Sequence, residues 1–160
     1  MKMSSTSWPS QQLKNLERIG TLVPEPTSSA EVQRLLDLAQ ASLSGARTTS
    51  LAVEPRFLLA YSAAHHLALA ALRANDYRTA AREGHRMLVF QTLPNTVGLD
   101  VGVSRTFDRA HRKRNELEYT GAVDVPASET EDLIAAVGKL QQSVEAWLST
   151  NRPELLEAGE

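Results

Sequence analysis

Apolar residues recur every three or four positions in five stretches of the chain, which is the periodicity of one face of an α-helix. The stretches cover residues 28–45, 55–74, 84–93, 99–119 and 128–151. Two of them open with a capping-box pattern, Ser28-x-x-Glu31 and Ser128-x-x-Glu131, in which each side chain bonds the other residue's free backbone N–H. We therefore expect five helices, of which the first and the last begin at these serines.

Proline, glycine and alanine refine this picture. Pro55 is expected at the first position of the second helix, where its missing N–H is harmless. Pro94 is expected to end the short third helix, and Gly121 to terminate the fourth. The second helix also carries a row of small residues that lets a neighbouring helix approach closely, which predicts a central, buried position; the row is Ala60, Ala64, Ala68 and Ala71.

No stretch alternates apolar and polar residues in the manner of a strand, so the sequence predicts an all-α fold. The expected architecture is an antiparallel helical bundle of four main helices plus one short helix, occupying residues 28–152. Residues 1–27 are expected to form an N-terminal arm with a short helix around Leu13, Leu16 and Ile19, and 153–160 a C-terminal tail. The arm either packs on the domain surface or serves as a docking segment.

The composition is typical of one globular domain in a reducing compartment. The 160 residues are 42% hydrophobic and 22% charged, and they include no cysteine, which excludes disulfides and thiolate metal sites. The longest apolar segment, 57–72, is interrupted by His65 and His66, and the N-terminal residues lack the apolar core of a signal peptide. We expect a cytoplasmic protein with no membrane segment, no cofactor and no metal, in which the two adjacent histidines serve packing.

Positive charge is concentrated at one place on this mildly acidic chain, whose net charge is −2. Residues 105–114 hold five Arg or Lys residues against one Asp. The segment from Glu116 to the end holds ten acidic residues against Lys139 and Arg152. A local basic patch on an acidic protein indicates an anionic partner that binds at that patch.

Arg114 is the residue of the fourth helix that most needs an explanation. It belongs to an apolar stripe whose other members are Val103, Phe107, Ala110 and Leu117. A guanidinium on a buried face is costly unless it is paired or placed at an interface, so Arg114 either pairs with Glu118 or faces a ligand. His111, Asn115 and Tyr119 form a second stripe of hydrogen-bonding groups beside it.

The motif Arg114-Asn115-x-x-x-Tyr119 resembles the signature of HEPN domains (higher eukaryotes and prokaryotes nucleotide-binding), an Arg followed four to six residues later by a His. Tyr119 stands where that family has its His. "FLLAYSAAHHLALAALRANDYR" is similar to the family's central long helix, "EGHRMLVFQTLP" to its Gly-His segment and "ETEDLIAAVGKLQQSVEAWL" to its final helix. The resemblance covers about residues 28–152, and the nearest subgroup is that of the actinobacterial SAV_6107-like HEPN proteins.

This resemblance implies a HEPN-like bundle that forms a homodimer, with the motif helices of both subunits meeting at a shared cleft. Many HEPN proteins are metal-independent endoribonucleases of toxin–antitoxin or defence systems. Carried over, Arg114 binds the phosphate of RNA, Asn115 orients the Arg or the ribose, and Tyr119 occupies the third catalytic position. Four further cations supply phosphate contacts that position RNA without reading its sequence, namely Arg105, Arg109, Arg112 and Lys113.

The group that moves the proton stays open at this point. A phenol titrates near pH 10, so Tyr119 is a poor general base at neutral pH compared with an imidazole. His111 and His85 are alternatives, and Glu118 is a further accessory residue; Arg105-x5-His111 also matches the motif spacing.

Two other functions compete with RNA cleavage. One is a catalytically inactive HEPN interaction module that pairs with a nucleotidyltransferase, with Tyr119 as the site of modification. The other is a helical dimer in which Arg114 only supports the interface.

Overall fold

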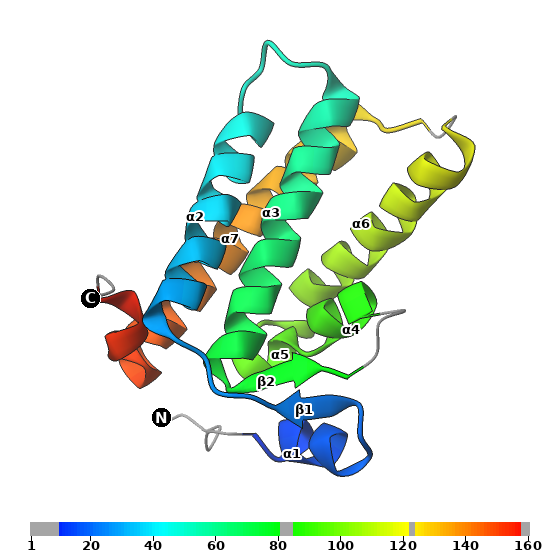
Figure 1. The fold of residues 1–160 in the computed structure, drawn as a ribbon. Helices are drawn as coiled ribbons and strands as arrows, with labels where there is room; N and C mark the ends of the chain where they lie inside the picture. The colour runs from blue at the N-terminus through cyan, green and yellow to red at the C-terminus, as the bar shows by residue number, and fades with distance from the viewer. Residues whose placement is uncertain (1–9, 81–84, 122–123, 158–160) are drawn as a thin grey trace.

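The computed structural model describes residues 10–80, 85–121 and 124–157, and its helices form a bundle (Figure 1). The long helices are α2 (Ser29–Ala46), α3 (Val53–Ala74), α6 (Val101–Thr120) and α7 (Ala127–Asn151). Each runs antiparallel to the one before it in the sequence (Figure 1). Two short helices, α4 (His85–Gln91) and α5 (Leu93–Thr96), lie between α3 and α6 in the sequence. The predicted all-α bundle is confirmed.

Helix α3 lies at the centre, between α2 and α6 and in front of α7 (Figure 1). Its four row alanines, at 60, 64, 68 and 71, are fully buried, as the sequence predicts. Of the helix pairs in the described ranges, α2 and α3 make the most extensive contact, because small side chains let their backbones come close. The site described below therefore stands on a rigid central helix.

The two capping patterns have different outcomes. Ser28 caps α2 as predicted, since its side chain accepts a hydrogen bond from the backbone N–H of Glu31. Ser128 does not cap α7, which begins one residue earlier, after Pro126. Glu131 instead forms an ion pair with the buried Arg56 at 2.8 Å, so a tertiary contact replaces the expected local one.

Two prolines lie inside helices that they were expected to bound. Helix α3 begins at Val53, so Pro55 lies in its first turn instead of at its first position. Pro94 does not end the preceding helix: α4 stops at Gln91, and Pro94 lies in the first turn of α5. First-turn N–H groups have no intrahelical acceptor, so proline is tolerated at both places. Gly121 terminates α6 with a φ of +65°, as predicted.

The expectation that the chain contains no strand is wrong. Strands β1 (Leu22–Pro24) and β2 (Tyr77–Thr79) pair antiparallel, with Leu22 opposite Thr79 and Pro24 opposite Tyr77. Each strand has three residues, which is too short to show an alternating pattern in the sequence.

The arm and the tail pack against the bundle at the end where β1 and β2 lie. Helix α1 (Gln11–Arg18) buries Leu13 completely, and Leu22 of β1 joins the same core. The buried Arg73 of α3 fixes this junction by donating to Glu31 at 2.8 Å and to backbone carbonyls of Glu25, Pro26 and Tyr77. At the other terminus, the short helix η1 (Pro153–Leu156) buries Leu155. Within the described ranges, the helices are not long and apolar enough for any of them to cross a bilayer.

Candidate functional site

Arg114 lies where helix α6 faces the N-terminal half of α3. Its guanidinium carbon is 5.4 Å from the centroid of the Tyr61 ring, an arrangement typical of a cation–π contact. The same guanidinium binds Glu118 Oε2 at 2.9 Å and donates to Asn115 Oδ1 at 3.4 Å. Arg114 is thus accommodated on the apolar stripe because its guanidinium stacks on the Tyr61 ring and its charge is paired with the more exposed Glu118.

A hydrogen-bonded chain joins Arg114 to α3 through His111. The amide Nδ2 of Asn115 lies 3.2 Å from His111 Nε2, and His111 Nδ1 lies 3.0 Å from the Tyr61 hydroxyl. His111, Arg114, Asn115 and Glu118 fall within about 100° of arc on an ideal helix, so one face of α6 carries them. Arg86 of α4 lies close enough to act on the pKa of both Tyr61 and His111. We call Tyr61, Arg86, His111, Arg114, Asn115 and Glu118 the α3–α6 cluster.

The electrostatics of the cluster favour a neutral imidazole. Burial, reinforced by the positive charges of Arg114 and Arg86, lowers the pKa of His111 below its ordinary value of 6.5. Burial also raises the pKa of the Tyr61 phenol, against the opposing effect of Arg86. At neutral pH, His111 is therefore a group that can accept a proton, and Tyr61 is one that can donate a hydrogen bond.

Sequence reasoning missed Tyr61 and Arg86. Tyr61 belongs to the buried central helix, where its aromatic ring counts as core, and it is 3% exposed. Arg86 belongs to α4 and lies close enough to Tyr61 and His111 to influence the pKa of both. A signal for Arg86 was present, because it follows directly after the Gly-His pair that resembles a HEPN segment. No sequence signal pointed to Tyr61, since helix packing alone brings it against α6.

Tyr119 lies outside the cluster. Its side chain is 90% exposed, at the C-terminal end of α6. Asn115 is the nearest cluster residue around the helix, about 40° away on an ideal helix. His85 begins α4, but its side chain lies outside the described part of the chain. The structure therefore brings together four of the predicted site residues, Arg114, Asn115, His111 and Glu118, and leaves Tyr119 apart.

The four predicted RNA-contacting cations divide between two sides of α6. Arg105 and Arg112 are exposed, with Asp108 on the same helix near both. Lys113 turns toward α7, where it lies 3.7 Å from Glu129. Arg109 folds back along its own helix and donates to Thr106 Oγ1 at 3.2 Å.

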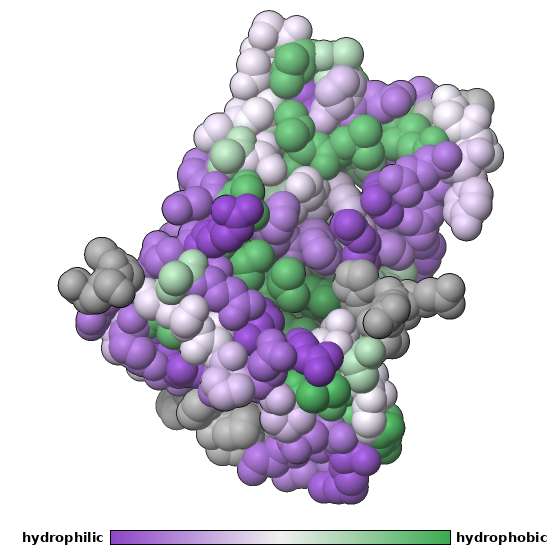
Figure 2. All heavy atoms as spheres, in the orientation of Figure 1, coloured by the Kyte–Doolittle hydropathy of each residue, from purple (hydrophilic) through white to green (hydrophobic). Residues whose placement is uncertain are grey.

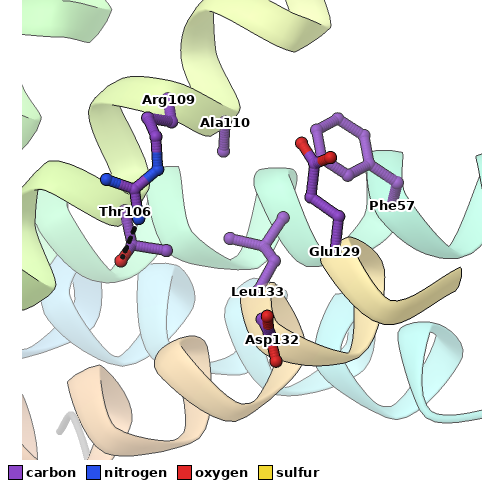
Figure 3. A pocket seen from close by; sticks show the side chains of 7 residues that line it. All are labelled: Phe57, Thr106, Arg109, Ala110, Glu129, Asp132 and Leu133. Atoms are coloured by element: carbon purple, nitrogen blue, oxygen red, sulfur yellow. Dashed lines mark hydrogen bonds between the residues drawn. The ribbon is translucent and has the colours of Figure 1, made fainter. Parts of the chain in front are cut away.

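Arg109 lines a hollow of about 300 Å³ between α6 and α7, on a floor formed by Phe57, Ala110 and Leu133 (Figure 3). Glu129 and Asp132 line the same hollow. These carboxylates repel a phosphate, which weakens the case for Arg109 and Lys113 as phosphate contacts.

The histidines of α3 do not form a metal site. His65 is 9% exposed and packs edge-on against Phe90, whereas His66 is half-buried, and burial lowers its pKa. Among the residues that the structure describes, three or more His, Cys, Asp or Glu side chains do not gather anywhere in a geometry that would hold a metal ion.

The surface over this region is mixed in character. Figure 2 shows hydrophilic atoms along α6 and apolar atoms over α3 and between the two helices. Leu58, near the start of α3, is a large apolar residue that is 38% exposed. The fold and site together define a small all-α bundle with a partly buried, cationic, hydrogen-bonded cluster. Comparison with protein-family models, with curated proteins and with solved structures gives no match.

Proposed function

We propose that the protein is a HEPN-type RNA-binding module that cleaves RNA at the α3–α6 cluster without a metal ion. The observation that carries this proposal is the chain Tyr61–His111–Asn115–Arg114, which places a neutral imidazole beside a guanidinium. A phosphate and the ribose next to it need these two groups: a cation for the phosphate and a base for the 2′-hydroxyl.

The chemical step follows from this pair. Arg114 holds the scissile phosphate, and His111 Nε2 takes the proton of the ribose 2′-hydroxyl, which displaces the Asn115 amide from that nitrogen. The 2′-oxygen attacks phosphorus, the bond to the 5′-oxygen breaks, and the leaving 5′-oxygen takes a proton from water. The products are a 2′,3′-cyclic phosphate and a 5′-hydroxyl. Asn115 positions the guanidinium, and Arg105 and Arg112 add phosphate contacts from the exposed arc of α6.

Of the groups that the sequence left open, this assignment gives the role of the base to His111, about one turn before Arg114, and not to Tyr119, which follows Arg114. His111 is half-buried and hydrogen-bonded on both ring nitrogens, whereas Tyr119 is 90% exposed. The lowered pKa of His111 keeps its imidazole in the neutral form that a general base requires at neutral pH.

The test is cleavage of a mixed tRNA and mRNA pool in EDTA. The wild type is expected to leave cyclic-phosphate ends, Arg114→Ala and His111→Ala to abolish cleavage, and Tyr119→Phe to retain it. Arg109→Ala is the matched control, because it removes one arginine charge from the same helix but no member of the cluster and no proposed phosphate contact. Cleavage that survives in Arg114→Ala, or that is lost equally in Arg109→Ala, would contradict the proposal.

We also propose that the protein acts as a homodimer that brings two α6 helices together. The exposed apolar atoms between α3 and α6 support this proposal, because such a surface is stabilised by a partner (Figure 2). Light scattering of the purified wild type is expected to give twice the mass of the chain, and Leu58→Glu, which puts a charge on an exposed apolar residue of α3, is expected to give the monomer mass. A monomer mass for the wild type at micromolar concentration would refute the dimer.

The exposure of Tyr119 favours a second candidate function, an interaction module that a nucleotidyltransferase modifies. A phenol that is 90% exposed at a helix end is open to a partner enzyme. Protein isolated from its native cells is then expected to carry a nucleotide-sized mass increment on the peptide that contains Tyr119. Unmodified peptide under conditions where the native protein does not cleave RNA would count against this function.

A further inference from the structure

The hydrogen bonds of the α3–α6 cluster fix the orientation of each polar group. A guanidinium can only donate, so the Asn115 oxygen must face Arg114. The amide nitrogen of Asn115 therefore faces His111 and donates to Nε2. Nε2 of the neutral imidazole then carries no hydrogen, and the ring proton lies on Nδ1.

This tautomer determines whether the Tyr61 hydroxyl donates or accepts in its hydrogen bond with His111. His111 Nδ1–H donates to the Tyr61 oxygen across 3.0 Å, so the hydroxyl's own hydrogen is not used in this contact. Two cations lie beside the Tyr61 side chain and have no lone pair to offer: Arg86, which acts on the pKa of the phenol, and Arg114, whose guanidinium carbon is 5.4 Å from the ring centroid. The nearby Glu118 carboxylate binds Arg114 through Oε2 at 2.9 Å and makes no hydrogen bond with Tyr61. Among the described residues, the hydrogen-bonding neighbours of the Tyr61 hydroxyl are therefore donors.

A hydroxyl hydrogen without an acceptor is unfavourable in a side chain that is 3% exposed. Two cations and one O–H beside the same aromatic ring offer donors that suit an anion with more than one oxygen. The groups come from three elements: Tyr61 from α3, Arg86 from α4 and Arg114 from α6. The motif on α6 accounts for only one of the three.

We propose that Tyr61 is a positioning residue whose hydroxyl donates to a non-bridging phosphate oxygen of RNA, with Arg86 and Arg114 on either side of that phosphate. This inference rests on the proposed function, because the phosphate belongs to the RNA bound at the same site. It adds a contact from the central helix that holds the phosphate in register with His111.

The test is binding of a fluorescein-labelled RNA decamer with 2′-O-methyl groups, which cannot be cleaved, followed by fluorescence anisotropy. Tyr61→Phe keeps the ring under Arg114 and deletes only the hydroxyl, so its Kd is expected to rise by about tenfold or more, the effect of one hydrogen bond to a charged group. Tyr77→Phe is the matched control: it deletes a hydroxyl that already has an acceptor, Glu17 at 2.7 Å, and its Kd is expected to equal that of the wild type.

Salt dependence separates a lost hydroxyl from a disturbed cation. Arg114→Ala and Arg86→Gln each remove a phosphate-neutralising charge, so the slope of log K against log salt is expected to fall by about 0.7 in each. Tyr61→Phe is expected to weaken binding at every salt concentration with the slope unchanged. A changed slope in Tyr61→Phe would mean that the substitution acts only by displacing Arg114, which would overturn the inference.

The two proposals fail in different ways. If Arg114→Ala weakens binding and Tyr61→Phe does not, the role of Tyr61 is refuted and the RNA site stands. If wild type and Arg114→Ala bind the decamer equally, the RNA site at the cluster is refuted and the role of Tyr61 falls with it.

Discussion

The Glu118 carboxylate is bound to the Arg114 guanidinium, which is the group that the proposed phosphate needs. Removing the charge of Glu118 is therefore expected to strengthen RNA binding. The carboxylate lies 2.9 Å from Arg114, and the side chains are 58% and 21% exposed, respectively. An incoming phosphate must displace this carboxylate and then lie close to its negative charge. Glu118→Gln removes the charge and keeps the shape of the side chain.

The expected gain in the free energy of RNA binding has two parts. A partly exposed pair four residues apart on a helix is worth about 0.4 kcal/mol, which the phosphate no longer has to overcome. Two like charges about 4 Å apart in a water-like surrounding repel by about 1 kcal/mol, and this repulsion also disappears. The sum of about 1.4 kcal/mol corresponds to a Kd about tenfold lower.

Anisotropy titration with the uncleavable decamer measures this change at two salt concentrations. Glu116→Gln is the control, because it removes the same charge from an exposed residue about 200° around the helix from Arg114, where a charge is largely screened. Glu118→Gln is also expected to lower the unfolding free energy by about 0.4 kcal/mol, so binding and stability move in opposite directions. Equal Kd values for the two variants, or weaker binding by Glu118→Gln, would refute the reasoning.

Three further predictions concern single groups. Arg73→Gln is expected to lower the unfolding free energy by about 3 kcal/mol, measured by urea titration, because it leaves Glu31 and several carbonyls without their buried donor. Arg73 lowers the pKa of Glu31, so the stability that this pair contributes is present above about pH 4.5 and is lost as the pH falls further; an acid-unfolding curve for Arg73→Gln that matches the wild type would count against this. Gly121→Ala is expected to cost roughly 1 kcal/mol, because its φ of +65° is unfavourable for a side chain although the space around it is open; an unchanged melting temperature would show that the α6 terminus rearranges freely. The cleavage rate is expected to rise with pH through a midpoint below 6.5 and to stay level near pH 7 to 8, because the pKa of His111 is lowered and its neutral form is the base; a midpoint near pH 9 would exclude His111.

The sequence was a good guide wherever a signal was local and repeated. Helical periodicity located the four long helices, and the Ser28 cap and the Gly121 terminator lie where the chain pattern places them. Each of these features depends on residues within one or two turns of each other. The same logic failed at Ser128, because Glu131 gains more from the buried Arg56, which is 75 residues away in the sequence.

The candidate site was only partly predictable for the same reason. The motif helix shows Arg114, Asn115, His111 and Glu118 on one arc, so their grouping follows from the 3.6-residue period. Which of them forms the centre does not follow, because Tyr119 belongs to the same four-residue repeat as His111. The position of α3 decides which residue is central. The Tyr61 hydroxyl lies 3.0 Å from His111 Nδ1, whereas Tyr119 extends into solvent beyond the end of the contact between α3 and α6.

By itself, the sequence determined that this protein is a helical bundle with a cluster of basic residues on one helix, because helix periodicity and charge order are properties of neighbouring residues. Only the tertiary structure decided that Arg114 stacks on Tyr61, that His111 is half-buried and neutral, and that Lys113 turns toward the acidic start of α7. Those outcomes depend on which helix faces which, and packing between residues 16 to 53 positions apart determines this.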